Sequence, residues 1–472
     1  GIMEPDRQQR SASLMDGGVE HIALTESILQ AVDPIEHTVL KRKVGVLGMV
    51  FIAFFWVSGG IYGNEELVRA GPGLYVLTFV VVMPLVFSLP VALMTAELAT
   101  AFPVDGGQCV YVQRACGDNV GGHNCYWVFV TNVIDASIYP LLAVQYLSYH
   151  APISYTLGRL VCMSMIVGVT LINLTGMDVL TRFQGIIFVV TLAPCLIFIG
   201  SGLSSLNPGA ALTTDSVPVN WSLLFAWVIW LYSGFSSLGT IAGETENPRR
   251  TYMATISILI PLIIVLNGLP LLVALSIDRD PLHYESGYFA HIAVQAAGPW
   301  LRLPIVVGSN LALVGLFNSQ AIAAQCTAFF FAESRPSFKS MRLRLLRTAM
   351  VSGWVRGRVV RWLCAVPESG VPRVYALLTA LVSCGLVWLP YAMLVEFEVL
   401  LYCSSQLLFF YSYIYLRAVH PDIPHRFTLG GGVKGAIATA AVPAATCVAN
   451  IYIGLFVGPY TSGGGSEWQG GG

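Results

Sequence analysis

A carboxylate and an aromatic ring lie one helical turn apart within an apolar segment. Asp135 lies near the middle of residues 120–148 and Tyr139 follows it four residues later, so a helix places both side chains on one face. Ionisable side chains inside a bilayer are costly and usually functional. A carboxylate beside an aromatic ring offers an ammonium ion a charge partner and a cation–π surface. We predict that Asp135 and Tyr139 bind a small organic cation; the alternative is a hydrogen-bonding role for Asp135 in a helix contact.

Two apolar segments are interrupted at corresponding places. The first break, residues 58–63, begins with Ser58-Gly59-Gly60, and the second break, residues 232–236, reads Tyr232-Ser233-Gly234-Phe235-Ser236. Paired breaks in two inverted halves indicate a transporter site at the bilayer midplane, because lipid offers the freed backbone groups no partner. The alternative is close helix packing through small residues. The predicted binding residues are Ser58, Gly59, Gly60, Asp135, Tyr139, Trp230, Tyr232, Gly234, Phe235 and Ser236.

The composition is typical of a membrane protein. Of the 472 residues, 55% are hydrophobic and only 11% are charged, whereas a soluble protein carries roughly 25% charged residues. Eleven apolar runs approach or exceed the length of about 20 residues that crosses a bilayer. They cover residues 44–68, 74–101, 120–148, 156–176, 183–203, 219–243, 252–277, 303–332, 374–394, 399–416 and 435–458. The sequence therefore predicts an all-α polytopic membrane protein.

The basic residues predict the orientation. With the N-terminus in the cytosol, 21 of the 25 lysines and arginines fall in the N-terminal tail and the inner loops, as the positive-inside rule requires. We expect a multi-pass protein of the plasma membrane that contacts membrane lipid and has a cytosolic N-terminus.

Further carboxylates lie near the ends of segments. Glu65 follows the first break on the outer side, whereas Glu97 and Glu244 lie near the inner ends of the second and sixth segments. We predict gating or proton-coupling roles for these three; a solvated vestibule charge and helix-capping charges paired with arginine are the alternatives. Only Pro390 and the Glu396–Glu398 pair separate the ninth segment from the tenth, and we expect the two glutamates at the membrane interface.

Several functions are excluded or disfavoured. The net charge of −1 and the lack of basic runs interleaved with aromatic residues argue against nucleic acid as a partner. No catalytic or nucleotide-binding motif occurs, so we expect no enzyme activity, metal, cofactor or obligate protein partner.

Transport would then be driven by an ion gradient or by exchange. We predict H⁺ as the ion, with Glu65, Asp135 or Glu97 protonated; Na⁺ held by carbonyls and Ser309 or Ser319 is the alternative.

The motifs resemble those of the amino acid–polyamine–organocation superfamily and are most similar to plant-type and protozoan polyamine uptake transporters. They lie at residues 57–65, 95–103, 106–107, 134–140, 242–250, 401–403, 416–417 and 420–422. The resemblance implies a LeuT-type fold of two inverted five-helix repeats, with the site among the first, third, sixth, eighth and tenth spans. It also implies proton-coupled uptake of putrescine, spermidine or a cationic amino acid.

The resemblance also assigns parts to the chain. We expect a disordered cytosolic tail at 1–43, repeats at 44–203 and 219–416, a basic cytosolic loop at 335–373, an additional span at 435–458 and a Gly-rich tail at 459–472, with no twelfth span. Plant-type members usually carry acids at the positions of Ser236, Asn318 and Phe409, so a dication should bind less tightly here or the substrate carries less charge. The alternatives are a neutral or cationic amino-acid permease of the same fold and a non-transporting membrane sensor or accessory subunit.

Overall fold

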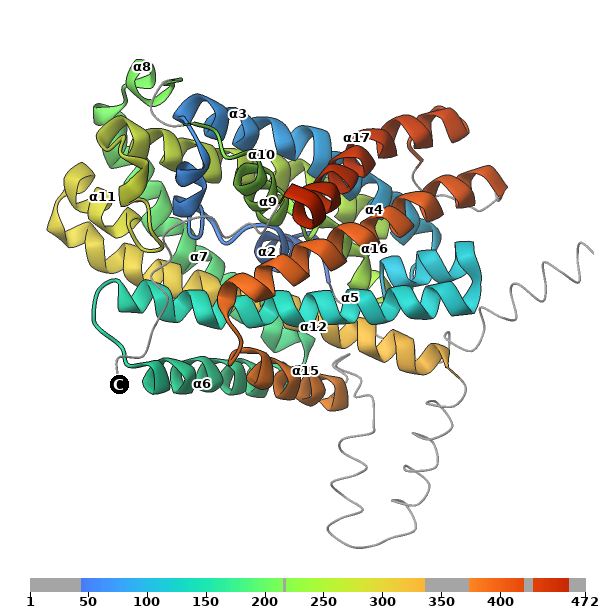
Figure 1. Ribbon diagram of the computed structural model, residues 1–472. Helices are drawn as coiled ribbons and strands as arrows, with labels where there is room; N and C mark the ends of the chain where they lie inside the picture. Colours follow the sequence, from blue (N-terminus) through green and yellow to red (C-terminus); the bar gives the residue numbers. More distant parts are fainter. Residues whose placement is uncertain (1–43, 215–217, 336–372, 420–427, 458–472) are drawn as a thin grey trace, which may run out of the picture. The chain divides into compact units, whose positions relative to one another are not determined.

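Helices are the regular elements throughout the part of the chain that the computed structural model describes, residues 44–214, 218–335, 373–419 and 428–457 (Figure 1). Nine of the helices in these ranges are long and apolar enough to cross a membrane. The chain is therefore an all-α polytopic membrane protein, which confirms the predicted fold class. The tail 1–43, most of the loop 335–373 and the tail 459–472 lie outside the described residues.

The long helices form because each backbone amide and carbonyl in lipid needs a partner within its own segment. In chain order the main helices are α2 (Val46–Val57), α3 (Gly73–Met83), α4 (Leu89–Ala101), α5 (Gln108–Ser148), α6 (Tyr155–Asn173), α7 (Met177–Gly202), α9 (Trp221–Tyr232), α10 (Pro248–Ile277), α12 (Arg302–Ser334), α15 (Arg373–Leu386), α16 (Tyr391–Val419) and α17 (Gly432–Tyr452). Shorter helices between or after them are η1 (Glu65–Ala70), η2 (Pro84–Ser88), η3 (Leu203–Ser205), α8 (Pro208–Ala211), η4 (Phe235–Glu244), η5 (Pro281–His283), α11 (Phe289–Ala297), η6 (Pro299–Leu301) and η7 (Ile453–Val457).

The ninth and tenth predicted segments separate at Pro390 and not at the Glu396–Glu398 pair. Helix α15 ends at Leu386 and α16 begins at Tyr391, directly after Pro390, whose ring disfavours helical backbone in the residue before it. Glu396 and Glu398 therefore lie inside α16. The Glu398 side chain is buried inside the protein and only 2% exposed.

Helix α5 is sharply kinked near its beginning. Gly117 has φ 80° and ψ 175°, a conformation that glycine adopts readily and L side chains rarely do. The kink separates residues 108–116 from the membrane-crossing part, which matches the predicted segment 120–148. As a result, Gln108 reaches the same cavity as Asp135 although the two are 27 residues apart in the sequence.

The two breaks meet inside the protein. Helix α2 ends at Val57 and α9 ends at Tyr232, and Gly234 follows in the left-handed region at φ 93°. A β-carbon on Gly234 would lie 2.0 Å from the Trp56 carbonyl oxygen. This contact allows the ends of α2 and α9 to approach closely, and it explains why the second break contains a glycine at this position.

Helix α5 crosses the centre of the bundle. Helices α12 and α16 pack along it, and α7 and α10 pack against α2 (Figure 1). Hydrogen bonds fix α2 to α12: Trp56 Nε1 donates to the Ser319 carbonyl at 2.6 Å, and the Ser319 hydroxyl donates to the Ile52 carbonyl at 3.1 Å. Helix α2, which leads into the first break, is thus attached to α12, and α12 packs along the helix that carries Asp135.

Gly234→Ala tests the contact between the breaks. We expect the free energy of unfolding to fall by at least about 2 kcal/mol, because the new methyl group meets a backbone oxygen and the left-handed backbone is strained. Thermal unfolding of the purified protein in detergent measures this. Gly200→Ala is the control, because Gly200 lies exposed on α7 with open space around it. An unchanged melting temperature for Gly234→Ala would contradict the contact.

Candidate functional site

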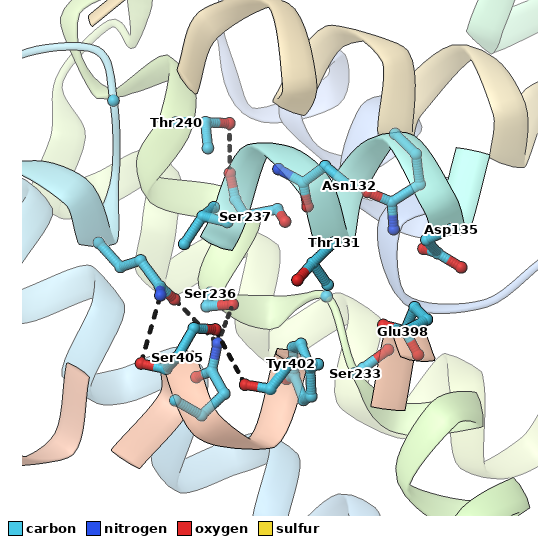
Figure 2. A pocket seen from close by; sticks show the side chains of 16 residues that line it. Thr131, Asn132, Asp135, Ser233, Ser236, Ser237, Thr240, Glu398, Tyr402 and Ser405 are labelled. Carbon is cyan, nitrogen blue, oxygen red and sulfur yellow. Dashed lines mark hydrogen bonds between the residues drawn. The ribbon is translucent and has the colours of Figure 1, made fainter. Parts of the chain in front are cut away.

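A polar cavity lies where α5, the second break, α12 and α16 come together (Figure 2). Its lining residues are Gly106, Gln108, Val128, Thr131, Asn132, Asp135, Ser233, Gly234, Ser236, Ser237, Thr240, Gln320, Glu398, Tyr402, Ser405 and Gln406. The free space inside is about 20 Å³, room for about one water molecule. A larger molecule therefore enters only if the surrounding helices move apart.

Asp135 is held in the cavity wall by two aromatic side chains. Its Oδ2 accepts a hydrogen bond from the Tyr139 hydroxyl at 3.0 Å, and its Oδ1 accepts one from Trp230 Nε1 at 3.2 Å. The Tyr139 and Trp230 rings stack at 6.2 Å between centroids. The structure thus brings together three of the residues predicted from the sequence. The two neutral donors stabilise the carboxylate without neutralising it.

Glu398 is a second carboxylate in the same cavity, which sequence reasoning missed. Figure 2 shows it at the same end of the cavity as Asp135. Glu398, Tyr402 and Ser405 follow one another at helical spacing on one face of α16. This spacing was the available signal, and the assumption that Glu396 and Glu398, with Pro390, belong to the separation between two segments concealed it. No lysine or arginine belongs to the cavity lining among the described residues.

The predicted binding residues fall into three groups. Asp135, Gly234 and Ser236 line the cavity, while Tyr139 and Trp230 hold Asp135. The remaining predicted residues lie outside the lining; they are Ser58, Gly59, Gly60, Tyr232 and Phe235.

The polar groups outside the lining have other partners. At the first break, the Gly60 amide donates to the Ser58 hydroxyl at 3.2 Å. At the second, the Tyr232 hydroxyl donates to the Val80 carbonyl at 2.7 Å. These two groups therefore have partners within the protein, and of the two breaks only the second borders the cavity.

Glu65 lies in a separate cluster of hydrogen bonds after the first break. Its Oε2 accepts from the Tyr146 hydroxyl at 2.5 Å and from the Gly63 amide at 3.0 Å, and its Oε1 accepts from the Gly287 amide at 3.4 Å. The next residue, Glu66, accepts from the Ser286 hydroxyl at 2.7 Å. These contacts fasten the loop before α11 to the first break and to α5.

Glu97 is neutralised by an ion pair. Arg417 Nη1 donates to its two carboxylate oxygens at 2.9 and 3.0 Å, and the Tyr413 hydroxyl donates at 2.9 Å. The backbone amide of Leu429 also donates to the Glu97 carboxylate, at 3.0 Å. Because Glu97 is fully buried and Arg417 is nearly so, the pair connects α4 with α16 in a setting of low polarity.

Two further acidic residues, Glu244 and Asp105, lie close together near the C-terminal end of η4. Glu244 is buried, and its carbonyl accepts a hydrogen bond from the Val44 amide at 3.0 Å. Asp105, in the loop between α4 and α5, accepts from the Gly243 amide at 2.8 Å. Burial raises the pKa of Asp105 to about 7, and the amides of Gly243 and Glu244 offset only part of this effect. Sequence reasoning did not single out Asp105.

Arg417→Gln tests the buried pair. We expect the free energy of unfolding to fall by about 3 kcal/mol or more, because Glu97 remains buried without its counter-charge. The double variant with Glu97→Gln should recover part of that loss. Arg159→Gln is the control, since Arg159 is only partly buried and lies over the Tyr155 ring, and it should change stability by less than about 1 kcal/mol. Equal losses in the single and double variants would contradict a stabilising role for the pair.

Comparison with known proteins agrees with this architecture. A family model described as amino acid permease matches residues 46–468. A probable polyamine transporter of Arabidopsis thaliana is 27% identical over 413 residues, which cover 85% of this chain and 77% of the relative. The polyamine transporter RMV1 of the same plant is 28% identical over 407 residues, which cover 85% of this chain and 79% of the relative.

The polyamine transporter PUT1 of Oryza sativa subsp. japonica is 28% identical over 413 residues, with 86% of this chain and 72% of the relative covered. These findings confirm the resemblance drawn from the motifs. Since the family model covers most of the sequence and the helices form a polytopic membrane protein, the chain belongs to the amino acid permease family of membrane transporters.

Proposed function

We propose that this protein takes up polyamines such as putrescine and spermidine, or cationic amino acids, by secondary-active transport. One observation carries the proposal: two buried carboxylates, Asp135 and Glu398, share a cavity whose described lining contains no basic residue. An organic cation supplies the missing positive charge. The names of the plant relatives as polyamine transporters support the same substrate class.

A neutral or cationic amino-acid permease is the second candidate, favoured by the description of the family. An amino acid also needs donors for its carboxylate, and backbone amides at a helix break suit this role. The amides of the first break lie outside the cavity lining, and that of Gly60 donates to Ser58. This arrangement supports cargo without a carboxylate. A non-transporting sensor or accessory subunit is the third candidate.

Transport would proceed by alternating access in a LeuT-type fold with two inverted repeats. The small volume of the cavity supports an occluded state. In this proposal the Glu65 cluster closes the outer side and the Glu97–Arg417 pair closes the inner side, with Glu244 near the inner end of η4. The protein would lie in the plasma membrane with its N-terminus in the cytosol.

A proton gradient would drive uptake, with Glu65, Asp135 or Glu97 as the protonatable group. Glu65 and Asp135 accept hydrogen bonds from neutral tyrosine and tryptophan donors, whereas Glu97 has an arginine partner. This difference favours the first two. For sodium, Ser309 and Ser319 are the candidate ligands; the Ser319 hydroxyl donates to Ile52 and accepts from Gln184 at 2.6 Å.

Asp135→Asn tests the substrate class. We expect uptake of labelled putrescine and arginine to fall at least about 30-fold, because a buried charge pair loses one member. Initial rates are measured in cells, normalised to protein at the surface. Glu396→Gln, on α16 but outside the cavity lining, is the control and should retain uptake. Uptake of leucine alone would favour the amino-acid permease. Ligand binding without accumulation would favour the sensor.

The coupling ion is tested in vesicles that contain the purified protein. We expect an inward gradient of one pH unit to raise putrescine accumulation up to about tenfold, since one unit corresponds to about 1.4 kcal/mol per proton. A sodium gradient at equal pH should have no effect. Accumulation that follows sodium and ignores the pH gradient would contradict proton coupling.

A further inference from the structure

The cavity has a second end that carries no charge. Gln406 Nε2 donates to Gln108 Oε1 at 2.9 Å and to the Ser236 hydroxyl at 3.0 Å, and Gln108 Nε2 donates to the Ser405 carbonyl at 3.4 Å. In Figure 2 Ser236 and Ser405, two members of this network, lie away from the end that holds Asp135 and Glu398. Gln406 follows Glu398 by eight residues on α16, which is about 12 Å of helix. The cavity therefore joins an acidic end to an amide end.

Two polar side-chain atoms of the cavity lining have hydrogen-bonding capacity that is left unused. The Gln406 side-chain oxygen is an unpaired acceptor and the Tyr402 hydroxyl is an unpaired donor, although Gln406 is only 1% and Tyr402 only 7% exposed. A buried polar group without a hydrogen bond costs about 1–3 kcal/mol. The two residues are four positions apart on α16, so their side chains lie on one face of the helix. A ligand with one donor and one acceptor satisfies both.

We propose that the cargo is an N-acylated diamine, with one ammonium group at the acidic end and one secondary amide at the amide end. The amide N–H donates to Gln406, and the amide oxygen accepts from Tyr402. This inference rests on the proposed function, in which Asp135 and Glu398 hold the ammonium. A second ammonium group at the amide end would lose its hydration without gaining a carboxylate partner. Burying an unpaired charge in this way costs free energy.

Competition between two probes tests the proposal. Initial uptake of labelled N-acetylputrescine and putrescine is measured in vesicles that contain the purified full chain. We expect the half-saturating concentration of N-acetylputrescine to be at least about tenfold lower than that of putrescine. Gln406→Glu should reverse this preference, because it places a carboxylate of the same shape at the amide end. The Gln108 amide and the Ser236 hydroxyl can turn to donate to the new carboxylate.

Tyr402→Phe is a second variant, and it tests the proposal independently of Gln406→Glu. It removes only the unpaired hydroxyl, so we expect uptake of N-acetylputrescine to weaken three- to tenfold more than uptake of putrescine. Gln295→Glu is the matched control, because Gln295 is exposed on α11 and the substitution makes the same chemical change outside the cavity. It should retain the preference.

The outcomes separate this inference from the proposed function. If both amines are taken up and both depend on Asp135, but putrescine is preferred, then the inference is overturned while the cation transporter stands. An unaltered preference in Tyr402→Phe would also overturn it. If neither amine is taken up by folded protein, then the proposed function fails and the inference fails with it.

Discussion

The requirement that buried backbone groups find partners inside the protein determines this structure more than any other constraint. Two helices stop in the apolar interior, and lipid offers their ends no hydrogen bonds. The two ends approach closely at Gly234 and the Trp56 carbonyl, and within the first break the Gly60 amide donates to the Ser58 hydroxyl. The cavity lies beside this junction, so the same glycine that permits the contact also positions Ser233 and Ser236 in the cavity wall.

Buried carboxylates are stabilised in different ways according to their location. Glu97 has an arginine partner, which makes it a structural connection between two helices. Glu65 and Asp135 accept hydrogen bonds from tyrosine, tryptophan or backbone donors. Neutral donors leave the negative charge uncompensated, and a charge in that state attracts a cation or a proton. The proposed transport function follows from this difference in electrostatic environment.

The polarity of the cavity changes from one end to the other. Carboxylates occupy one end, and glutamine and serine side chains occupy the other. A substrate that extends along α16 thus meets a charged environment and then an uncharged one. Selectivity is expected to depend on the second end as much as on the first, because rejecting a second ammonium requires only that no counter-charge be present.

Local sequence determined the helical segments, both breaks and the placement of Asp135 and Tyr139 on one face, because helix geometry acts over a few residues. Glycine and proline positions marked most element ends for the same reason. Tertiary structure alone decided that Glu398 joins Asp135, that Trp230 donates to it and that Arg417 pairs with Glu97, 320 residues away. It also decided that the first break lies outside the cavity lining. Such contacts depend on how distant helices pack, and the spacing of residues along the chain does not encode that packing directly.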